Sequence, residues 1–129
     1  MASWTDVTNA LRGLEGVEPV QARMGRQWKL NDRLLAWERP LRKSDLEALG
    51  DAAPQGDILG VRVPMEIKEA LVERRVPAYF TIPHFNGYPA ILVHLPSIKA
   101  SELKPFLKSA HAERAKQKRP PSRRKRRSP

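Results

Sequence analysis

The chain contains no cysteine among its 129 residues. This absence excludes a disulfide framework, a thiolate zinc site, an iron–sulfur cluster and a cysteine nucleophile. Long apolar runs are also missing, since the longest, such as 90–93, fall far short of the roughly 20 residues that span a bilayer. The N-terminal stretch carries an acid and several polar residues but no apolar segment of the signal-peptide type. We therefore expect no membrane insertion and a cytoplasmic location, either free or associated with the nucleoid.

The motifs of common enzymes are missing as well. The sequence has no G-x-G-x-x-G, P-loop, G-x-S-x-G or H-E-x-x-H pattern. His84 and His94 could approach each other across a β–β connection and hold a metal with a carboxylate, but His94 lies within an apolar strand pattern. Glu66, Glu69 and Glu73 have helical spacing, yet basic residues interleave with them as on a solvated helix face. We predict a protein that is not an enzyme, with no catalytic residues, no metal and no cofactor.

Positive charge is what the chain has in excess, with a formal net charge of +10. Residues 116–129 hold eight basic residues and no acid, so residues 1–115 carry only +2. A proline- and charge-rich segment of this kind cannot bury apolar surface, which predicts one folded domain over 1–115 and a disordered basic tail over 116–129. Such a tail binds polyanions without sequence specificity. Its candidate nucleic-acid-binding residues are Lys118, Arg119, Arg123, Arg124, Lys125, Arg126 and Arg127.

Within the domain, the excess positive charge is confined to residues 23–43, which sum to +5. This stretch is predicted to contain a β-hairpin over 22–39, turning at Asn31-Asp32. A basic hairpin can lie along a phosphate backbone, although charges also protect an edge strand from pairing with other chains. Strand alternation does not decide between the two, because it points Lys29 away from Trp28 but places Arg33 and Arg39 on the side of Trp37. The candidate residues are Arg23, Arg26, Lys29, Arg33, Arg39, Arg42 and Lys43.

The order of the predicted elements indicates the fold class. Helices and strands alternate without a strict βαβ repeat, which favours an α+β, two-layer sandwich with an antiparallel sheet. Ser3 or Thr5 is expected to cap the first helix, and Ser44-x-x-Glu47 fits a capping box. Pro105 is expected to delay or kink the last helix. The predicted elements are a helix over 3–14, the hairpin, a helix over 44–49, a strand over 58–63, a helix over 64–74, strands over 79–82 and 90–95, and a helix over 101–115.

The loop over residues 83–89 (PHFNGYP) is the least generic stretch of the chain. It places the rings of His84, Phe85 and Tyr88 between two strands, and these rings could stack on a base or another ligand. The alternative is structural: Phe85 and Tyr88 close one end of the core, while Gly87 supplies a positive φ. Both interpretations stay open from the sequence.

Four stretches resemble the MmcQ/YjbR family in its longer, actinobacterial-style branch: LEGVEP, RQWKLNDRLLAWERPLRKSDLEALGD, ILGVRVPMEIKEAL and PAYFTIPHFNGYPAILVHLPSIKASELKPFL. The resemblance covers residues 3 to about 115, and Pro105 and His111 depart from the family pattern in the last helix. It implies the fold of the frataxin-like (YjbR/CyaY-like) group, an antiparallel sheet with helices on one face. It also implies DNA binding through a double wing of hairpins, here 28–37 and 79–95, and it brings no catalytic residues.

The resemblance to frataxins does not imply iron binding, because frataxins use a strongly acidic first helix. Here the corresponding helix region offers only Asp6 and Glu15. We therefore predict a non-enzymatic protein that binds DNA, or RNA, largely without sequence specificity, through basic hairpin wings and the tail. The alternative is a protein-interaction or small-ligand module with its site at the loop from His84 to Tyr88.

Overall fold

The structure is a computed structural model that describes residues 1–23 and 25–117. The basic tail is predicted to begin at residue 116, but Lys116 ends a helix and Gln117 caps it; the rest of the predicted tail, from residue 118 onward, lies outside the described residues. The helices are α1 (Trp4–Arg12), α2 (Lys43–Leu49), α3 (Met65–Glu73) and α4 (Ala100–Lys116). The strands are β1 (Val17–Ala22), β2 (Gly25–Leu30), β3 (Arg33–Glu38), β4 (Ile58–Arg62), β5 (Tyr79–Phe80) and β6 (Ala90–His94).

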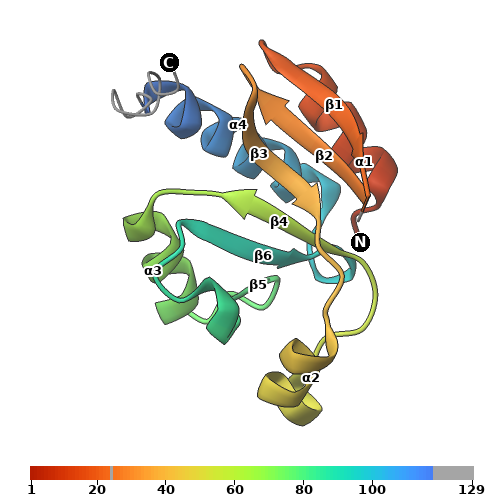
Figure 1. The fold of residues 1–129 in the computed structure, drawn as a ribbon, viewed down its shortest axis with the longest axis vertical. Helices are drawn as coiled ribbons and strands as arrows, with labels where there is room; N and C mark the ends of the chain where they lie inside the picture. The colour runs from red at the N-terminus through yellow and green to blue at the C-terminus, as the bar shows by residue number, and fades with distance from the viewer. Residues whose placement is uncertain (24, 118–129) are drawn as a thin grey trace, which may run out of the picture.

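The strands form one sheet in the order β1-β2-β3-β4-β6-β5, and every neighbouring pair is antiparallel. The predicted α+β class with an antiparallel sheet is confirmed. Helices α1 and α4 lie behind the sheet in Figure 1, and α3 packs at the end of β5 and β6. Helix α2 extends below the sheet in the same view and contacts the loop over 83–89. No helix of the described residues crosses the front of β1, β2 and β3.

Alternation along the strands produces two separate cores, because successive side chains point to opposite faces of the sheet. The helix-side core packs Val61, Ile91 and Val93 against α1 and α4, with Ile67 and Leu71 of α3 joining it. The other face carries a smaller cluster, here called the loop-side core. It consists of Ile58, Ile82, Phe85, Ala90 and Leu92, with Trp37, Leu41, Leu49, Phe80 and Tyr88 packed against them.

Apart from Ala22, strand β1 occupies residues for which the sequence predicts no regular element. It pairs with β2 along its whole length and places Pro19 opposite Trp28. Proline cannot donate a hydrogen bond to a sheet, but an outermost strand needs backbone bonds on one side only. Pro19 is therefore compatible with an edge strand. The structure adds β1 to the predicted order of elements.

A β-bulge in β3 overturns the predicted facing of one candidate residue. Trp28 pairs with Ala36 but Lys29 pairs with Leu34, so Leu35 is an extra residue. Leu35 and Ala36 are both buried in the helix-side core. The extra residue reverses the alternation, and Arg33 lies on the helix side of the sheet rather than on the side of Trp37.

Two helix starts also differ from those predicted. Helix α2 begins at Lys43, and the Asp45 carboxylate accepts the backbone N–H of Arg42 at 2.9 Å, the role expected of Glu47. Helix α4 begins at Ala100 and continues through Pro105. The first helix agrees with its prediction, because Ser3 and Asp6 form a reciprocal capping box.

Trp37 lies directly against the backbone of β4, at a point where that strand has no side chain. The register places Trp37 opposite Gly60. A Cβ atom at Gly60 would lie 2.7 Å from both Cε2 and Cζ2 of the indole, well inside van der Waals contact. Glycine at this position is therefore what allows the indole to lie on the sheet.

We predict that Gly60→Ala destabilises the protein, because the added methyl group displaces the Trp37 ring. Overpacking of this kind costs about 1–3 kcal/mol, measurable by urea unfolding followed by circular dichroism. Gly13→Ala is the matched control, since its Cβ would lie 4.0 Å from the nearest atom. Equal stabilities of the two variants would contradict this role of Gly60.

Candidate functional site

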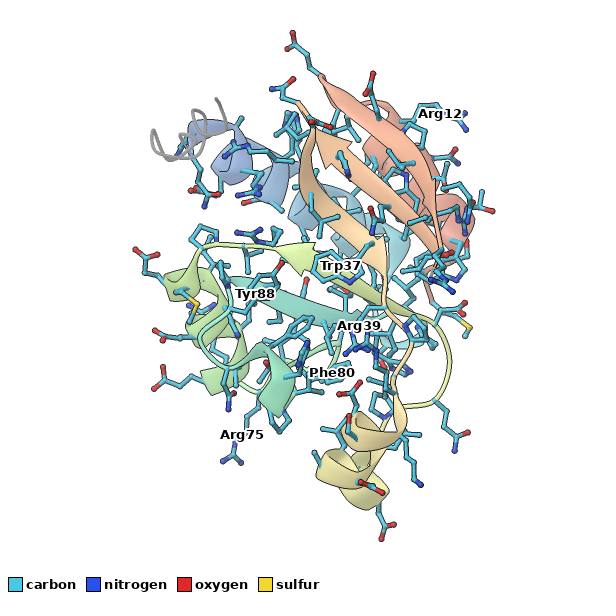
Figure 2. All side chains as sticks on the ribbon, in the orientation of Figure 1. Arg12, Trp37, Arg39, Arg75, Phe80 and Tyr88 are labelled. Carbon is cyan, nitrogen blue, oxygen red and sulfur yellow. The ribbon has the colours of Figure 1, made fainter. Side chains whose placement is uncertain are left out.

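A cavity of about 650 Å³ lies on the loop side of the sheet, between the end of β3 and the loop over 83–89. Its volume falls within the range of about 300–1,000 Å³ that is typical of small-molecule sites. Figure 2 shows Trp37, Arg39, Phe80 and Tyr88 gathered on the sheet face turned to the viewer. The cavity joins the two regions that the sequence singles out, the basic stretch and the loop. It is lined by Gln27, Leu34, Trp37, Glu38, Arg39, Pro40, Leu41, Arg42, His84, Phe85 and Tyr88.

The loop over 83–89 is fixed in place by a buried lysine of α3. Lys68 is only 5% exposed, and its ammonium group donates hydrogen bonds to the carbonyl oxygens of Phe85 and Tyr88, the latter at 2.7 Å. Burial lowers the pKa of Lys68, opposed in part by the carboxylate of Glu69. Sequence reasoning missed this residue, because it treated the basic residues of this helix as a solvated face.

The three rings of the loop have different surroundings. Phe85 is 3% exposed and packs its ring 5.4 Å from that of Tyr88 and 6.1 Å from that of Trp37. Phe85 therefore closes the loop-side core, and Gly87 takes the expected positive φ of 77°. His84 is exposed and Tyr88 half-buried, and both line the cavity.

Three of the seven candidate cations in 23–43 are engaged within the fold. Arg26 forms an ion pair with Glu38 at 2.8 Å, and Arg33 donates to the carbonyl oxygens of Arg114 and Gln117 at the end of α4. Arg39 is 5% exposed, which removes its side chain from the protein surface. The contacts of these three arginines lie within the protein, so their role is structural.

Arg39 lies under the loop with its charge balanced by a single carboxylate. Its Nη1 atom is 3.1 Å from Asp45 Oδ2 and donates to the carbonyl oxygen of Pro40. The guanidinium lies 5.7 Å from the centroid of the Phe85 ring, close enough for a cation–π contact. Its Nη2 atom is buried and has no hydrogen-bond partner among the described residues. One donor at the wall of the cavity is thus left unsatisfied.

The other four candidate cations, Arg23, Lys29, Arg42 and Lys43, form no ion pair with any residue in 1–23 or 25–117. Gln27 is opposite Trp37 in the sheet register, so the turn before β2 and the end of β3 lie at the same end of the sheet. Arg23 lies in that turn, and Arg42 and Lys43 lie beyond the end of β3, at the start of α2; all three are exposed. We call these three residues the basic end.

Neither histidine discussed as a metal ligand belongs to a metal-binding cluster. The ring nitrogens of His94 contact the hydroxyl of Ser97 at 2.6 Å and the carbonyl oxygen of Gln55 at 2.7 Å. Across the described ranges, no three His, Cys, Asp or Glu side chains gather closely enough to hold a metal ion. Within the same ranges, no helix has the length and apolar character needed to cross a membrane.

Comparison with curated proteins finds mycobacterial relatives. The chain is 47% identical over 115 residues to the uncharacterized protein Rv2570 of Mycobacterium tuberculosis, covering 85% of this chain and 86% of the relative. The uncharacterized protein Mb2600 of Mycobacterium bovis matches with the same identity and coverage. No model of a protein family matches the chain, and no solved structure matches it.

We predict that Lys68→Met destabilises the protein, because the carbonyl groups of Phe85 and Tyr88 lose a buried donor. An unsatisfied buried polar group costs about 1–3 kcal/mol, and urea unfolding measures the loss. Lys108→Met, an exposed residue of α4, is the control and should change little.

The stability lost in Lys68→Met should also depend on pH. The folded pKa of Lys68 is below its usual 10.5, so the unfolded chain binds more protons between the two values. The advantage of the wild type over Lys68→Met should therefore grow as the pH rises through the folded pKa towards 10.5. A difference that shrinks over this range would contradict the assignment.

Proposed function

Because the chain belongs to the family of these uncharacterised mycobacterial proteins, whose names assign no activity, we propose from its charge arrangement that it is a non-enzymatic nucleic-acid-binding protein. The observation that carries the proposal is the basic end. Its three cations are exposed and form no ion pair in the described ranges, whereas Arg26, Arg33 and Arg39 are engaged within the fold. Lys29, which is half-buried and opposite Leu34 in the register, adds a fourth cation on the sheet face that no described helix covers. Binding to phosphates by such residues releases counterions and needs no particular base sequence. A cytoplasmic, nucleoid-associated location accords with this function.

The start of the basic tail lies at the other end of β3. The carbonyl oxygen of Gln117 accepts a hydrogen bond from Arg33, the first residue of β3. A strand of six residues is about 20 Å long, the length of about six base pairs of B-DNA. A nucleic acid that lies along β3 can therefore contact the basic end and the tail's cations together.

The resemblance to the MmcQ/YjbR family supports the same function. The first wing that it implies, 28–37, corresponds to β2 and β3, and the second, 79–95, to β5 and β6 with the loop between them. The cavity lies between these two segments. DNA is the partner that we propose, with RNA as an outcome of the test.

We predict that the full-length protein binds duplex DNA with an affinity that falls steeply with salt. Each phosphate contact contributes about −0.9 to the slope of log K against log salt concentration. Replacing Arg23, Arg42 and Lys43 by Gln should make the slope shallower by up to about 2.7, and replacing the seven cations from Lys118 to Arg127 by Gln by up to about 6. Fluorescence anisotropy with a labelled duplex measures both effects, and a parallel series with RNA tests the choice of nucleic acid.

A triple variant with the same number of charges removed elsewhere controls for net charge. Arg74 and Arg75 are exposed just after α3, and Lys108 is exposed on α4. Their replacement by Gln should leave the slope closer to that of the wild type than the basic-end variant does. If the basic-end variant keeps the wild-type affinity and slope, only the tail binds. If the wild type does not bind even at low salt, the proposed function is wrong.

A further inference from the structure

We propose that the cavity beside Trp37 binds one unpaired nucleotide, with its base stacked on the indole and its phosphate at Arg42 and His84. This inference rests on the proposed function, to which it adds a preference for nucleic acid with an unpaired residue. It also unites the basic stretch and the ring-bearing loop in a single site.

The stacking surface is the outer face of the Trp37 ring. One face of the indole lies on β4, held there by the space that Gly60 leaves. The ring lines the cavity, so the face turned away from the sheet is the one that a ligand meets. Bases of every sequence have a flat π face, and they stack on aromatic side chains in proteins that bind single strands.

The cavity borders the part of the sheet that no described helix covers. Gln27 of β2 and Leu34 of β3 line it on that side, and the loop lines it on the other. Tyr88 stands at the loop side with its ring held by Arg62, whose guanidinium is 5.0 Å from the ring centroid and donates to the carbonyl oxygen of Pro89. A nucleotide can therefore enter from the uncovered face, where the proposed polyanion lies.

The charges around the cavity favour an anionic group at its rim. Glu38 is the one carboxylate among the described lining residues, and Arg26 neutralises it. The charge of Arg39 is balanced by the carboxylate of Asp45, and its Nη2 atom is buried. Arg39 therefore forms part of the cavity wall and does not contact the phosphate. Arg42 is exposed and has no ion-pair partner in the described ranges, and His84 is exposed across the cavity. The phosphate is therefore placed at the rim and the base inside.

A base joined to a phosphate occurs both in an unpaired nucleotide of a nucleic-acid strand and in a free mononucleotide. The experiment uses three probes to separate them: a labelled single strand of roughly 12 nucleotides, within the site sizes of such proteins, a blunt duplex of the same sequence, and AMP. Anisotropy measures the first two, and the indole N–H resonance of Trp37 reports AMP. The full-length protein is used throughout.

Trp37→Leu should weaken binding of the single strand by on the order of 5- to 100-fold, the loss of one stacked base, and leave binding of the duplex unchanged. Leu34→Phe, which fills the cavity without removing the indole, should have the same selective effect. Leu46→Phe, on the exposed side of α2, is its matched control. Leu34→Phe keeps the test valid if Trp37→Leu does not fold.

Selective loss of single-strand binding in Leu34→Phe, with a shift of the Trp37 resonance by AMP, supports the site. Unchanged single-strand binding in the cavity variants overturns it, while salt-dependent duplex binding leaves the proposed function intact. If AMP binds at Trp37 but neither nucleic acid binds, the site takes free nucleotides and the proposed function fails. If none of the three probes binds, both proposals are wrong.

Discussion

The packing of Trp37 on Gly60 sets the boundary between the covered and the bare half of the sheet. The register aligns Phe80, Leu92, Gly60, Trp37 and Gln27 in one row across five strands. On one side of the indole the loop-side core is sealed by the loop over 83–89, and on the other side no described helix covers the strands. A large ring at this boundary leaves a step in the surface. The cavity lies beside this ring, between the end of β3 and the loop over 83–89.

The loop that forms one wall of this cavity is held in place by hydrogen bonds to its backbone carbonyl groups. A tight loop packed onto a sheet buries carbonyl groups that no strand partner can satisfy. Lys68 supplies the missing donors from α3, although burying an ammonium group costs free energy that only good hydrogen bonds offset. On the opposite wall, Asp45 serves both the start of α2 and the Arg39 guanidinium. Two buried cations thus hold the two walls.

Local patterns predicted most elements and the fold class, but long-range pairing determined the rest. Alternating apolar residues and the cap at Ser3 are readable over a few positions. The bulge at Leu35 exists only in relation to β2, so no pattern within β3 reveals that Arg33 turns to the helix side. Lys68 and Arg39 have the composition of surface residues, and only the tertiary contacts bury them. The cavity joins residues more than forty positions apart, which explains why the basic stretch and the loop were predicted as competing sites.

Contacts within the fold reduce the number of cations in 23–43 that are left to bind phosphates. Seven cations in 23–43 are predicted as one phosphate-binding surface, yet ion pairs and a helix end occupy three of them. In the proposed function, the remaining charges and the tail supply an attraction that weakens with salt and does not distinguish one nucleic acid from another. A base held against Trp37, as proposed for the cavity, would supply a contact of the opposite kind, which depends little on salt and requires an unpaired residue. Affinity and discrimination then arise from different parts of the molecule, so a mutation can alter one without the other.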